Sequence, residues 1–184
     1  MADASFGPTA LATPANAVTI GRLAATPLLL AVIVATGPSY PATMLWAAVA
    51  LTDGVDGFLA RRHGTTRSGA FLDPLADKVA VLGAMVALVA KSRFWWFPVA
   101  LIAAREVVIS AYRSAAGRQG VSIPARQSAK LKTVVQDVAV GFALLPSTAG
   151  HRWVANSFLW FAVVLTVVTG AQYLLDGRRA ARAV

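Results

Sequence analysis

Four aspartates lie close together in a chain that is otherwise apolar enough to cross a membrane several times. Asp53 and Asp56 are three residues apart, Asp73 and Asp77 are four residues apart, and apolar sequence flanks both pairs. They make up half of the eight acidic residues in this chain of 184 residues. A carboxylate in or beside a bilayer is costly and indicates a functional site by default. Four of them need positive charge between them, from neighbouring Arg and Lys side chains or from divalent cations.

Composition predicts an integral membrane protein of the all-α class. Hydrophobic residues make up 57% of the sequence and charged residues 14%, against about 25% charged residues in an ordinary soluble domain. Apolar stretches long enough to span a bilayer, about 20 residues each, predict a single bundle of six transmembrane helices. Their ranges are Ile20–Gly37, Pro41–Leu59, Ala70–Ala90, Trp95–Ala115, Ala129–Pro146 and Val154–Leu175. The chain contains no cysteine, so disulfide and thiolate chemistry is excluded.

The basic residues predict how the bundle is oriented. With a cytoplasmic N-terminus, all but three of the 17 Lys and Arg residues fall on the cytoplasmic side, the three being Lys91, Arg93 and Arg152. Cytoplasmic loops of membrane proteins carry an excess of Lys and Arg. We therefore expect a multi-pass protein of the cell membrane, with both termini and the four aspartates facing the cytoplasm. The net charge of +9 fits this bias and contact with anionic lipids, and we expect no nucleic-acid partner.

We expect one domain over residues 16–176. Residues 1–15 lack the basic segment of a signal peptide and predict a flexible lead-in, whereas residues 177–184 predict a basic cytoplasmic tail. No internal repeat and no long linker divides the sequence between them, so the six predicted helices belong to one unit.

The spacing of the aspartates predicts two carboxylate faces that meet. Residues three or four positions apart share one face of a helix. The first pair ends the second predicted helix and the second pair begins the third, so the two helices would be antiparallel neighbours. The small residues Gly57, Ala60 and Gly69 leave room for a ligand or a neighbouring backbone beside these faces. The alternative for a single aspartate is a helix cap, or an ion pair with a neighbouring Arg or Lys.

The residues around the aspartates resemble the signature of the CDP-alcohol phosphatidyltransferases. The pattern D-x2-D-G-x2-A-R-x7-G-x3-D-x3-D is formed here by Asp53, Asp56, Gly57, Ala60, Arg61, Gly69, Asp73 and Asp77. The usual spacing of the family between the arginine and the following glycine is one residue longer. The resemblance extends from Asn16 to Leu175, because the layout of six helices matches as well.

The resemblance implies a reaction and a role for each residue of this signature. Members of the family displace CMP from a CDP-linked lipid with the hydroxyl group of a second alcohol. The resemblance implies two divalent ions, Mg²⁺ or Mn²⁺, that would hold the pyrophosphate. Their implied ligands are Asp53, Asp56, Asp73 and Asp77. Asp77 would also accept the proton of the attacking hydroxyl group. The residues implied for the nucleotide pocket are Gly57, Ala60, Arg61 and Gly69.

A second basic region predicts an anionic acceptor alcohol. Residues 103–136 contain six Lys and Arg residues near the predicted cytoplasmic face. An arginine within an apolar helix, such as Arg105, normally faces a cavity or a partner, and clustered cations bind phosphate groups. We assign Arg105, Arg113 and Lys132 to the phosphate group of the acceptor. The alternative for each is ordinary positive charge on the cytoplasmic side.

Further segments are similar to the branch of the family that makes phosphatidylglycerophosphate. These segments are PANAVTIGRLAATP, GAFLDPLADKVAV, AREVVISAYRS and AKLKTVVQ. The resemblance implies CDP-diacylglycerol as the donor and glycerol 3-phosphate as the acceptor, in phospholipid biosynthesis. An inositol phosphate would fit the same basic region and stays an alternative acceptor. Members of the family are commonly homodimers, so a homodimer is expected in addition to contacts with membrane lipids.

Two non-enzymatic interpretations compete with the transferase. A divalent-cation carrier would place its carboxylates near the middle of the bilayer, often in broken helices of two related halves. Here the aspartates lie at helix ends and no repeat relates the halves of the chain. A scaffold would leave the D-G-x2-A-R segment without an explanation, so we expect an enzyme.

Overall fold

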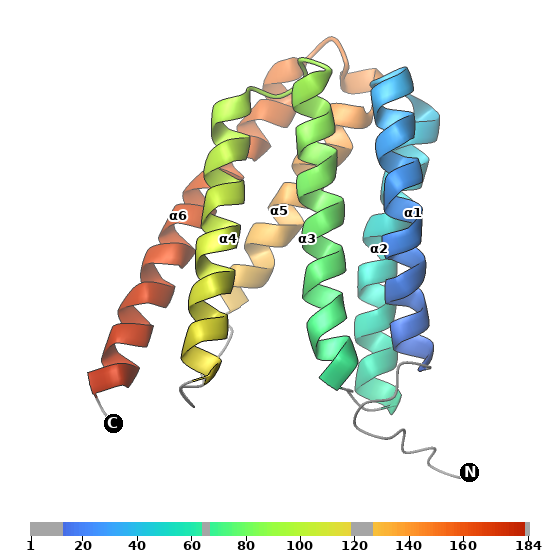
Figure 1. Cartoon of the computed structure of the whole chain (residues 1–184). Coiled ribbons are helices and arrows are strands. Elements are labelled where there is room, and N and C mark those ends of the chain that lie inside the picture. Colours follow the sequence, from blue (N-terminus) through green and yellow to red (C-terminus); the bar gives the residue numbers. More distant parts are fainter. Residues whose placement is uncertain (1–12, 64–66, 119–126, 183–184) are drawn as a thin grey trace.

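The protein is a bundle of α-helices (Figure 1). The computed structural model describes residues 13–63, 67–118 and 127–182. Its elements are α1 (Pro14–Thr36), α2 (Tyr40–His63), α3 (Arg67–Ala90), α4 (Trp96–Arg118), α5 (Gln127–Leu144), the short 3₁₀ helix η1 (Pro146–Thr148) and α6 (Arg152–Arg182). Each apolar stretch of the sequence coincides with one α-helix, and the prediction of an all-α fold is confirmed.

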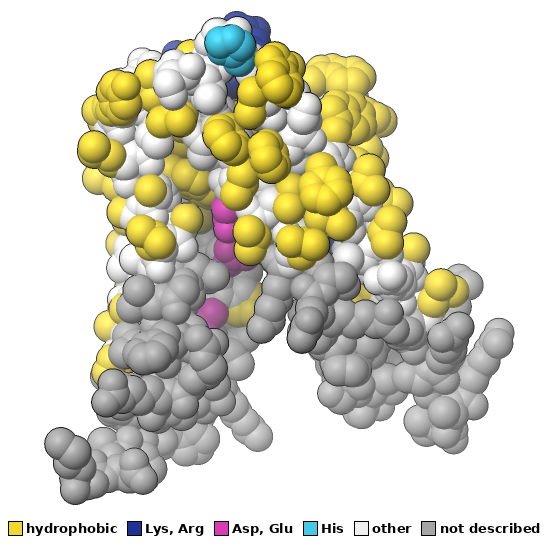
Figure 2. All heavy atoms as spheres, turned by 180° about the vertical axis from the view of Figure 1, so that it is seen from behind, with side chains coloured by type: hydrophobic (Ala, Val, Ile, Leu, Met, Phe, Trp, Pro, Cys, Tyr) yellow, Lys and Arg dark blue, Asp and Glu magenta, His cyan; other side chains and the backbone are white. Residues whose placement is uncertain are grey.

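The surface of the bundle is suited to a membrane. Two stretches of helix in the described ranges, Asn16–Thr36 and Arg152–Leu175, are long and apolar enough to cross one, and Tyr40–Thr52 is a shorter apolar helix. Large hydrophobic side chains such as Met44 and Val107 are 70% and 67% exposed, and apolar atoms cover the flanks in Figure 2. Proteins that stay in water rarely expose apolar patches of this extent, so the surface indicates association with a membrane.

The helices form two halves that diverge toward the end where the chain termini lie (Figure 1). In one half α1 packs against both α2 and α3, and in the other α6 packs against α4 and α5. Where the halves meet, the core contains side chains from both, including Leu29, Met85, Leu144 and Leu159, each fully buried. Figure 2 shows acidic side chains in the groove between the two halves.

Local sequence fixes where α1 begins and ends. The Thr13 hydroxyl accepts a hydrogen bond from the backbone N–H of Asn16 at 3.1 Å, and Pro14 occupies the first turn. Such a cap satisfies a backbone donor that the helix cannot pair internally. At the other end Gly37 adopts a φ of 65° and its N–H donates to the Ile33 carbonyl at 2.9 Å. Glycine adopts this conformation without steric cost.

The end of α3 is built differently, because a serine takes the left-handed position. Ser92 has a φ of 54°. Its N–H donates to the Val89 carbonyl at 2.9 Å, and the N–H of Arg93 donates to the Leu88 carbonyl at 2.8 Å. This pair of bonds is a Schellman motif, whose left-handed residue is usually glycine. The motif ends α3 and turns the chain toward α4, while its hydrogen bonds tie the turn to the last carbonyl groups of α3.

We expect the conformation of Ser92 to limit which residues the turn accepts. Ser92→Val should lower the free energy of unfolding by about 1–2 kcal/mol relative to Ser92→Gly, since a β-branched side chain clashes in the left-handed region. Thermal unfolding of both variants in detergent micelles measures the difference. Equal stability of the valine and glycine variants would contradict the assigned backbone conformation.

Candidate active site

The residues of the signature lie on two helices. α2 contains Asp53 and Asp56, and α3 contains Asp73 and Asp77. The side chains of residues 53–71 lie outside the described part of the chain. The predicted nucleotide residues are therefore placed only by their helices, with Gly57, Ala60 and Arg61 on α2 and Gly69 on α3. The convergence of all four carboxylates stays a prediction.

Asp73 is held in place from α1. The Thr19 hydroxyl donates to Asp73 Oδ1 at 2.6 Å, and Thr19 itself is only 1% exposed. Hydrogen bonds from a hydroxyl to a carboxylate are among the short, charge-assisted ones. The contact joins residues 54 positions apart in sequence, so it depends on the packing of α1 against α3.

A polar stripe along α1 explains why this helix supports the site. The stripe consists of Asn16, Thr19, Arg22 and Thr26, all at most 3% exposed. Their spacing of three or four residues puts them on one helix face. Arg22 Nε donates to the Thr52 hydroxyl at 3.2 Å, directly before Asp53 on α2. α1 therefore holds both helices that carry the aspartates. Sequence reasoning gave this stripe no role of its own, although buried polar residues at helical spacing in an apolar span were a usable signal.

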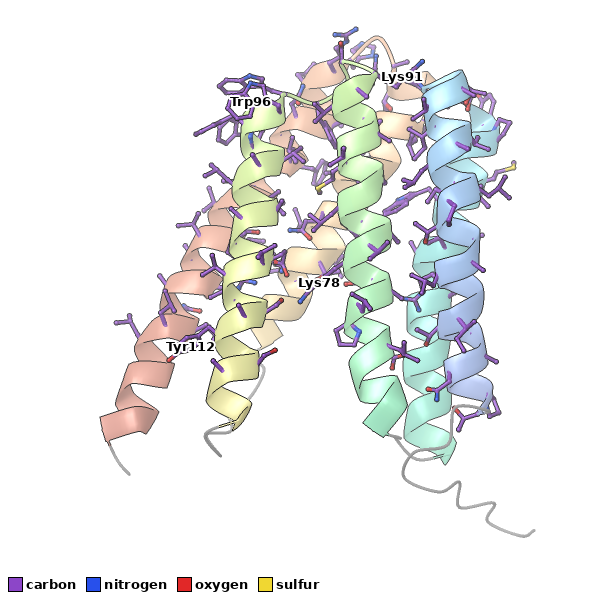
Figure 3. The ribbon with its side chains drawn as sticks, in the orientation of Figure 1. Lys78, Lys91, Trp96 and Tyr112 are labelled. Atoms are coloured by element: carbon purple, nitrogen blue, oxygen red, sulfur yellow. The ribbon has the colours of Figure 1, made fainter. Side chains whose placement is uncertain are left out.

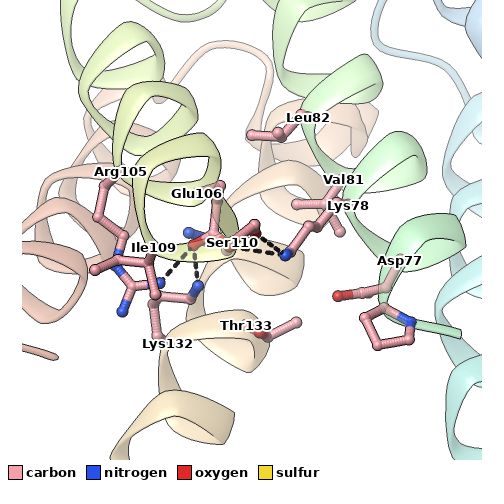
Figure 4. Close-up of a pocket in the computed structure, with 12 residues that line it drawn as sticks. Asp77, Lys78, Val81, Leu82, Arg105, Glu106, Ile109, Ser110, Lys132 and Thr133 are labelled. Atoms are coloured by element: carbon pink, nitrogen blue, oxygen red, sulfur yellow. Dashed lines mark hydrogen bonds and ion pairs between the residues drawn. The ribbon is translucent and has the colours of Figure 1, made fainter. Parts of the chain in front are cut away.

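Asp77 opens into a pocket between the two halves of the bundle (Figure 4). The pocket has a volume of about 160 Å³ and is lined by residues of α3, α4 and α5. Its polar lining comprises Asp77, Lys78, Arg105, Glu106, Ser110, Lys132, Thr133 and Gln136. The structure thus brings the predicted base, Asp77, together with two of the three residues predicted to bind the acceptor phosphate. The third, Arg113, lies on α4 with its side chain outside the described part.

Three cations converge on one carboxylate in this pocket. Glu106 Oε1 accepts a hydrogen bond from Arg105 Nη1 at 3.0 Å and forms an ion pair with Lys132. Glu106 Oε2 lies 3.9 Å from Lys78 Nζ, and Lys78 also donates to the Ser110 hydroxyl. Glu106 and Lys132 are 7% and 5% exposed. We call Glu106, Lys78, Arg105 and Lys132 the Glu106 cluster.

The Glu106 cluster carries more positive than negative charge in a confined space. Its three cations face one carboxylate, and buried charges are stable only when they are paired and hydrogen-bonded. A phosphate monoester, with a charge of about −1.5 to −2 at neutral pH, would complete this pairing. Sequence reasoning assigned no role to Glu106 or Lys78. Glu106 was visible beside Arg105, but its contact with a lysine 26 residues away was not.

α6 fixes the arginine of the Glu106 cluster. Arg105 Nε donates to the Thr166 carbonyl at 3.2 Å, and Nη2 donates to the Thr169 hydroxyl at 3.0 Å. A Cβ atom at Gly170 would lie 3.2 Å from Arg105 Nε, so glycine leaves the space that this side chain occupies. With the bond to Glu106, three of the five N–H groups of a guanidinium are engaged. Arg105 is thereby oriented toward the pocket.

The carboxylates that the structure describes suit a hard divalent cation. Asp73 and Asp77 lie one helical turn apart on α3, and carboxylate oxygens are the ligands that Mg²⁺ and Mn²⁺ prefer. Among the described residues there is no group of three or more potential metal ligands. The remaining predicted ligands, Asp53 and Asp56, have side chains beyond those residues. The two predicted ligands whose side chains the structure describes, Asp73 and Asp77, therefore have the chemistry that the expected ions prefer.

Comparison with known proteins agrees with the family resemblance of the sequence. The family model of the CDP-alcohol phosphatidyltransferases matches residues 12–168. A probable phosphatidylglycerophosphate synthase of Mycobacterium tuberculosis is 37% identical over 175 residues, which cover 92% of this chain and 83% of that protein. CDP-diacylglycerol–glycerol-3-phosphate 3-phosphatidyltransferases of Escherichia coli and Shigella flexneri are 38% identical over 148 residues, which cover 78% of this chain and 81% of each relative.

Removing the negative charge of Glu106 should destabilise the bundle. We expect Glu106→Gln to lower the free energy of unfolding by about 3–5 kcal/mol, because it leaves buried cations without their counter-ion. Glu106→Asp, which keeps the charge, should cost less. Thermal unfolding in detergent compares the two variants with the unmodified chain. If the glutamine variant proved as stable as the aspartate variant, charge pairing would not be what holds this region together.

Proposed function

The chain belongs to the CDP-alcohol phosphatidyltransferase family, and we propose that it transfers the phosphatidyl group of CDP-diacylglycerol to glycerol 3-phosphate. The products are phosphatidylglycerophosphate and CMP. The observation that carries the proposal is the pocket in which Asp77 lies across from the Glu106 cluster (Figure 4). A carboxylate base and a phosphate-binding group are the two functions that a phosphorylated alcohol acceptor requires. The relatives in Escherichia coli and Shigella flexneri are named for this reaction.

The Glu106 cluster binds the phosphate group of the acceptor. Lys132 and Lys78 supply ammonium groups, and Arg105 supplies a guanidinium that α6 already orients. Charge-assisted hydrogen bonds to phosphate are about twice as strong as neutral ones. Arg113, two turns beyond Arg105 on α4, adds a further cation toward the cytoplasmic end. A neutral acceptor such as serine would leave the excess positive charge of the cluster uncompensated.

Asp77 acts as the general base. A hydroxyl group of the bound acceptor gives its proton to the Asp77 carboxylate, and the hydroxyl oxygen forms a bond to the phosphorus of the phosphatidyl group. The bond between that phosphorus and the oxygen of CMP breaks, and CMP leaves as an anion. Asp77 lines the same pocket as the phosphate-binding cations. The acceptor can therefore contact the base and the cluster at once.

The donor side of the reaction belongs to α2 and α3. Asp53, Asp56, Asp73 and Asp77 hold two divalent ions, Mg²⁺ or Mn²⁺, which when bound offset the charge of the pyrophosphate and of the leaving CMP. The hydroxyl of Thr19 orients Asp73 for this role. Residues proposed for the nucleotide pocket are Gly57, Ala60, Arg61 and Gly69. Support for these four comes from the family signature.

The bundle spans the cell membrane six times, with the active site facing the cytoplasm. The support for this orientation is the excess of Lys and Arg at the end of the bundle that carries both termini. The two halves diverge at the same end (Figure 1), and the pocket that Asp77 lines lies between them, where a polar acceptor from water and a lipid donor from between the helices would meet. The homodimer expected from the resemblance remains a prediction.

The geometry argues against a cation carrier. Carriers of this kind hold their ions in broken helices at the middle of the bilayer. α2 and α3 are each continuous over 24 residues, and the aspartates lie toward the ends of these helices that a short connection joins. An inositol phosphate remains the alternative acceptor that the Glu106 cluster could bind, and acceptor competition separates the two.

Replacing Asp77 tests the assignment of the base. Asp77→Asn should reduce CMP release at least about a hundredfold, the lower limit of what a general base typically contributes. Folding should remain intact, and CDP-diacylglycerol should still bind. Asp137→Asn, a matched change on α5 away from the pocket, should keep most of the activity. Full turnover by the Asp77 variant would show that another group takes the proton.

Replacing Lys132 tests the acceptor site. Lys132→Ala should raise the KM for glycerol 3-phosphate about tenfold or more, since a hydrogen bond between charged groups contributes about 1.5–3 kcal/mol. The KM for CDP-diacylglycerol should change little. Steady-state CMP release at varied concentrations of each substrate measures both constants. An unchanged KM for the acceptor would leave Lys132 with a structural role in pairing Glu106.

A further inference from the structure

A second polar pocket lies at the end of the bundle away from Asp77. It has a volume of about 550 Å³ and is formed where the turn between α3 and α4 meets the start of α6. The residues that line it are Val89, Ser92, Arg93, Phe94, Trp95, Trp96, Arg152, Asn156 and Trp160. We call it the Arg93–Arg152 pocket. Two of these residues are cations, Arg93 and Arg152, and none is acidic. The pocket therefore carries positive charge without a counter-ion among its own lining residues.

The guanidinium of Arg93 is held in place but only partly satisfied. Its Nη2 donates to the Ala149 carbonyl at 2.9 Å. Its Nε is buried and has no hydrogen-bond partner among the described residues. Burial and the positive charge of Arg152 both lower the pKa of Arg93 from its usual value. The two arginines therefore repel each other, and a shared anion would remove the repulsion.

Arg152 completes the pair from α6. Its Nη1 donates to the Ser92 carbonyl at 3.3 Å, so the left-handed turn at Ser92 helps to place this side chain. The described hydrogen bonds engage one N–H group of each arginine, of the five that a guanidinium carries. The remaining donors suit an anion with several oxygens, because guanidinium groups bind phosphate oxygens in pairs.

The other wall of the Arg93–Arg152 pocket is aromatic and exposed. Trp95 and Trp96 are 56% and 60% exposed, and the rings of Trp95 and Trp160 lie 6.3 Å apart. Figure 3 shows Trp96 and Lys91 at this end of the bundle, with Lys78 and Tyr112 toward the other. Exposed tryptophans settle at the level of the lipid headgroups. The pocket therefore lies at the depth where lipid phosphates are found.

We propose that the Arg93–Arg152 pocket binds the phosphodiester headgroup of an anionic phospholipid, in the leaflet opposite the active site. The phosphate accepts hydrogen bonds from the two arginines, and the upper part of the acyl chains packs on the tryptophan rings. A zwitterionic lipid is disfavoured because its ammonium group would meet the positive charges of Arg93 and Arg152. Free phosphate would satisfy the arginines but would leave the exposed rings of Trp95 and Trp96 without a partner. This site does not depend on the reaction proposed above.

Tryptophan fluorescence of the full chain in detergent tests the proposal directly. The protein is titrated with phosphatidylglycerol whose acyl chains carry bromine, which quenches nearby indole rings. Quenching should saturate, and Arg152→Gln should raise the half-saturating concentration about tenfold, as expected for the loss of a charged hydrogen-bonding partner. Lys91→Gln, which removes a cation at the same end but outside the pocket, should behave like the unmodified chain. Brominated phosphatidylcholine should need at least about tenfold more lipid.

Three results would overturn the proposal. Equal quenching curves for Arg152→Gln and the unmodified chain would show that the arginines do not select the lipid. Equal curves for phosphatidylglycerol and phosphatidylcholine would indicate simple partitioning into the micelle. Inorganic phosphate at millimolar concentration could raise the melting temperature of the unmodified chain but not of Arg152→Gln, and could displace the brominated lipid. That result would show that the pocket is a site for free phosphate. CMP release by Arg152→Gln should match the unmodified chain, and a loss would contradict the separation of the two sites.

Discussion

The active region depends on one buried carboxylate that holds cations from three helices. Glu106 on α4 pairs with Lys78 on α3, with Lys132 on α5 and with its neighbour Arg105, which α6 in turn anchors. Without this counter-ion, several positive charges could not lie so close together inside an apolar bundle. The same contacts hold Lys78, Arg105 and Lys132 at the pocket that Asp77 also lines. The contacts among α3, α4 and α5 at this pocket and the proposed acceptor site thus rest on one interaction.

In the proposed reaction, one half of the bundle binds the donor and the other half supplies most of the acceptor site. α2 and α3 carry the aspartates, and the polar stripe of α1 holds α2 through Arg22 and α3 through Thr19. α4 and α5 carry two of the three cations that suit a phosphorylated acceptor, Arg105 and Lys132, and α6 anchors Arg105. The pocket between the halves, where Asp77 faces the Glu106 cluster, is the place proposed for the transfer. In this arrangement a lipid and a water-soluble substrate would reach one site from different sides.

The sequence was sufficient for the class of fold and for the family. Six apolar stretches coincide with six helices, and the spacing of Asp53, Asp56, Asp73 and Asp77 predicted the family that comparison confirms. Arg105 and Lys132 line one pocket, and their assignment to the acceptor phosphate stays a prediction. The roles of Thr19 and Glu106 were missed, because their decisive contacts are made across helices, 54 and 26 residues away. Periodicity shows which face of a helix is polar but not which helix that face meets.

Transfer of a phosphatidyl group from CDP-diacylglycerol to glycerol 3-phosphate releases CMP. The most direct test is CMP release by the purified protein in detergent, with CDP-diacylglycerol and Mg²⁺, while glycerol 3-phosphate, inositol 3-phosphate, free inositol and serine are offered separately. We expect release only with glycerol 3-phosphate and none after addition of EDTA, because carboxylate-bound divalent ions offset the charge of the leaving group. Release with a different alcohol, or none with any of them from a folded protein, would contradict the account.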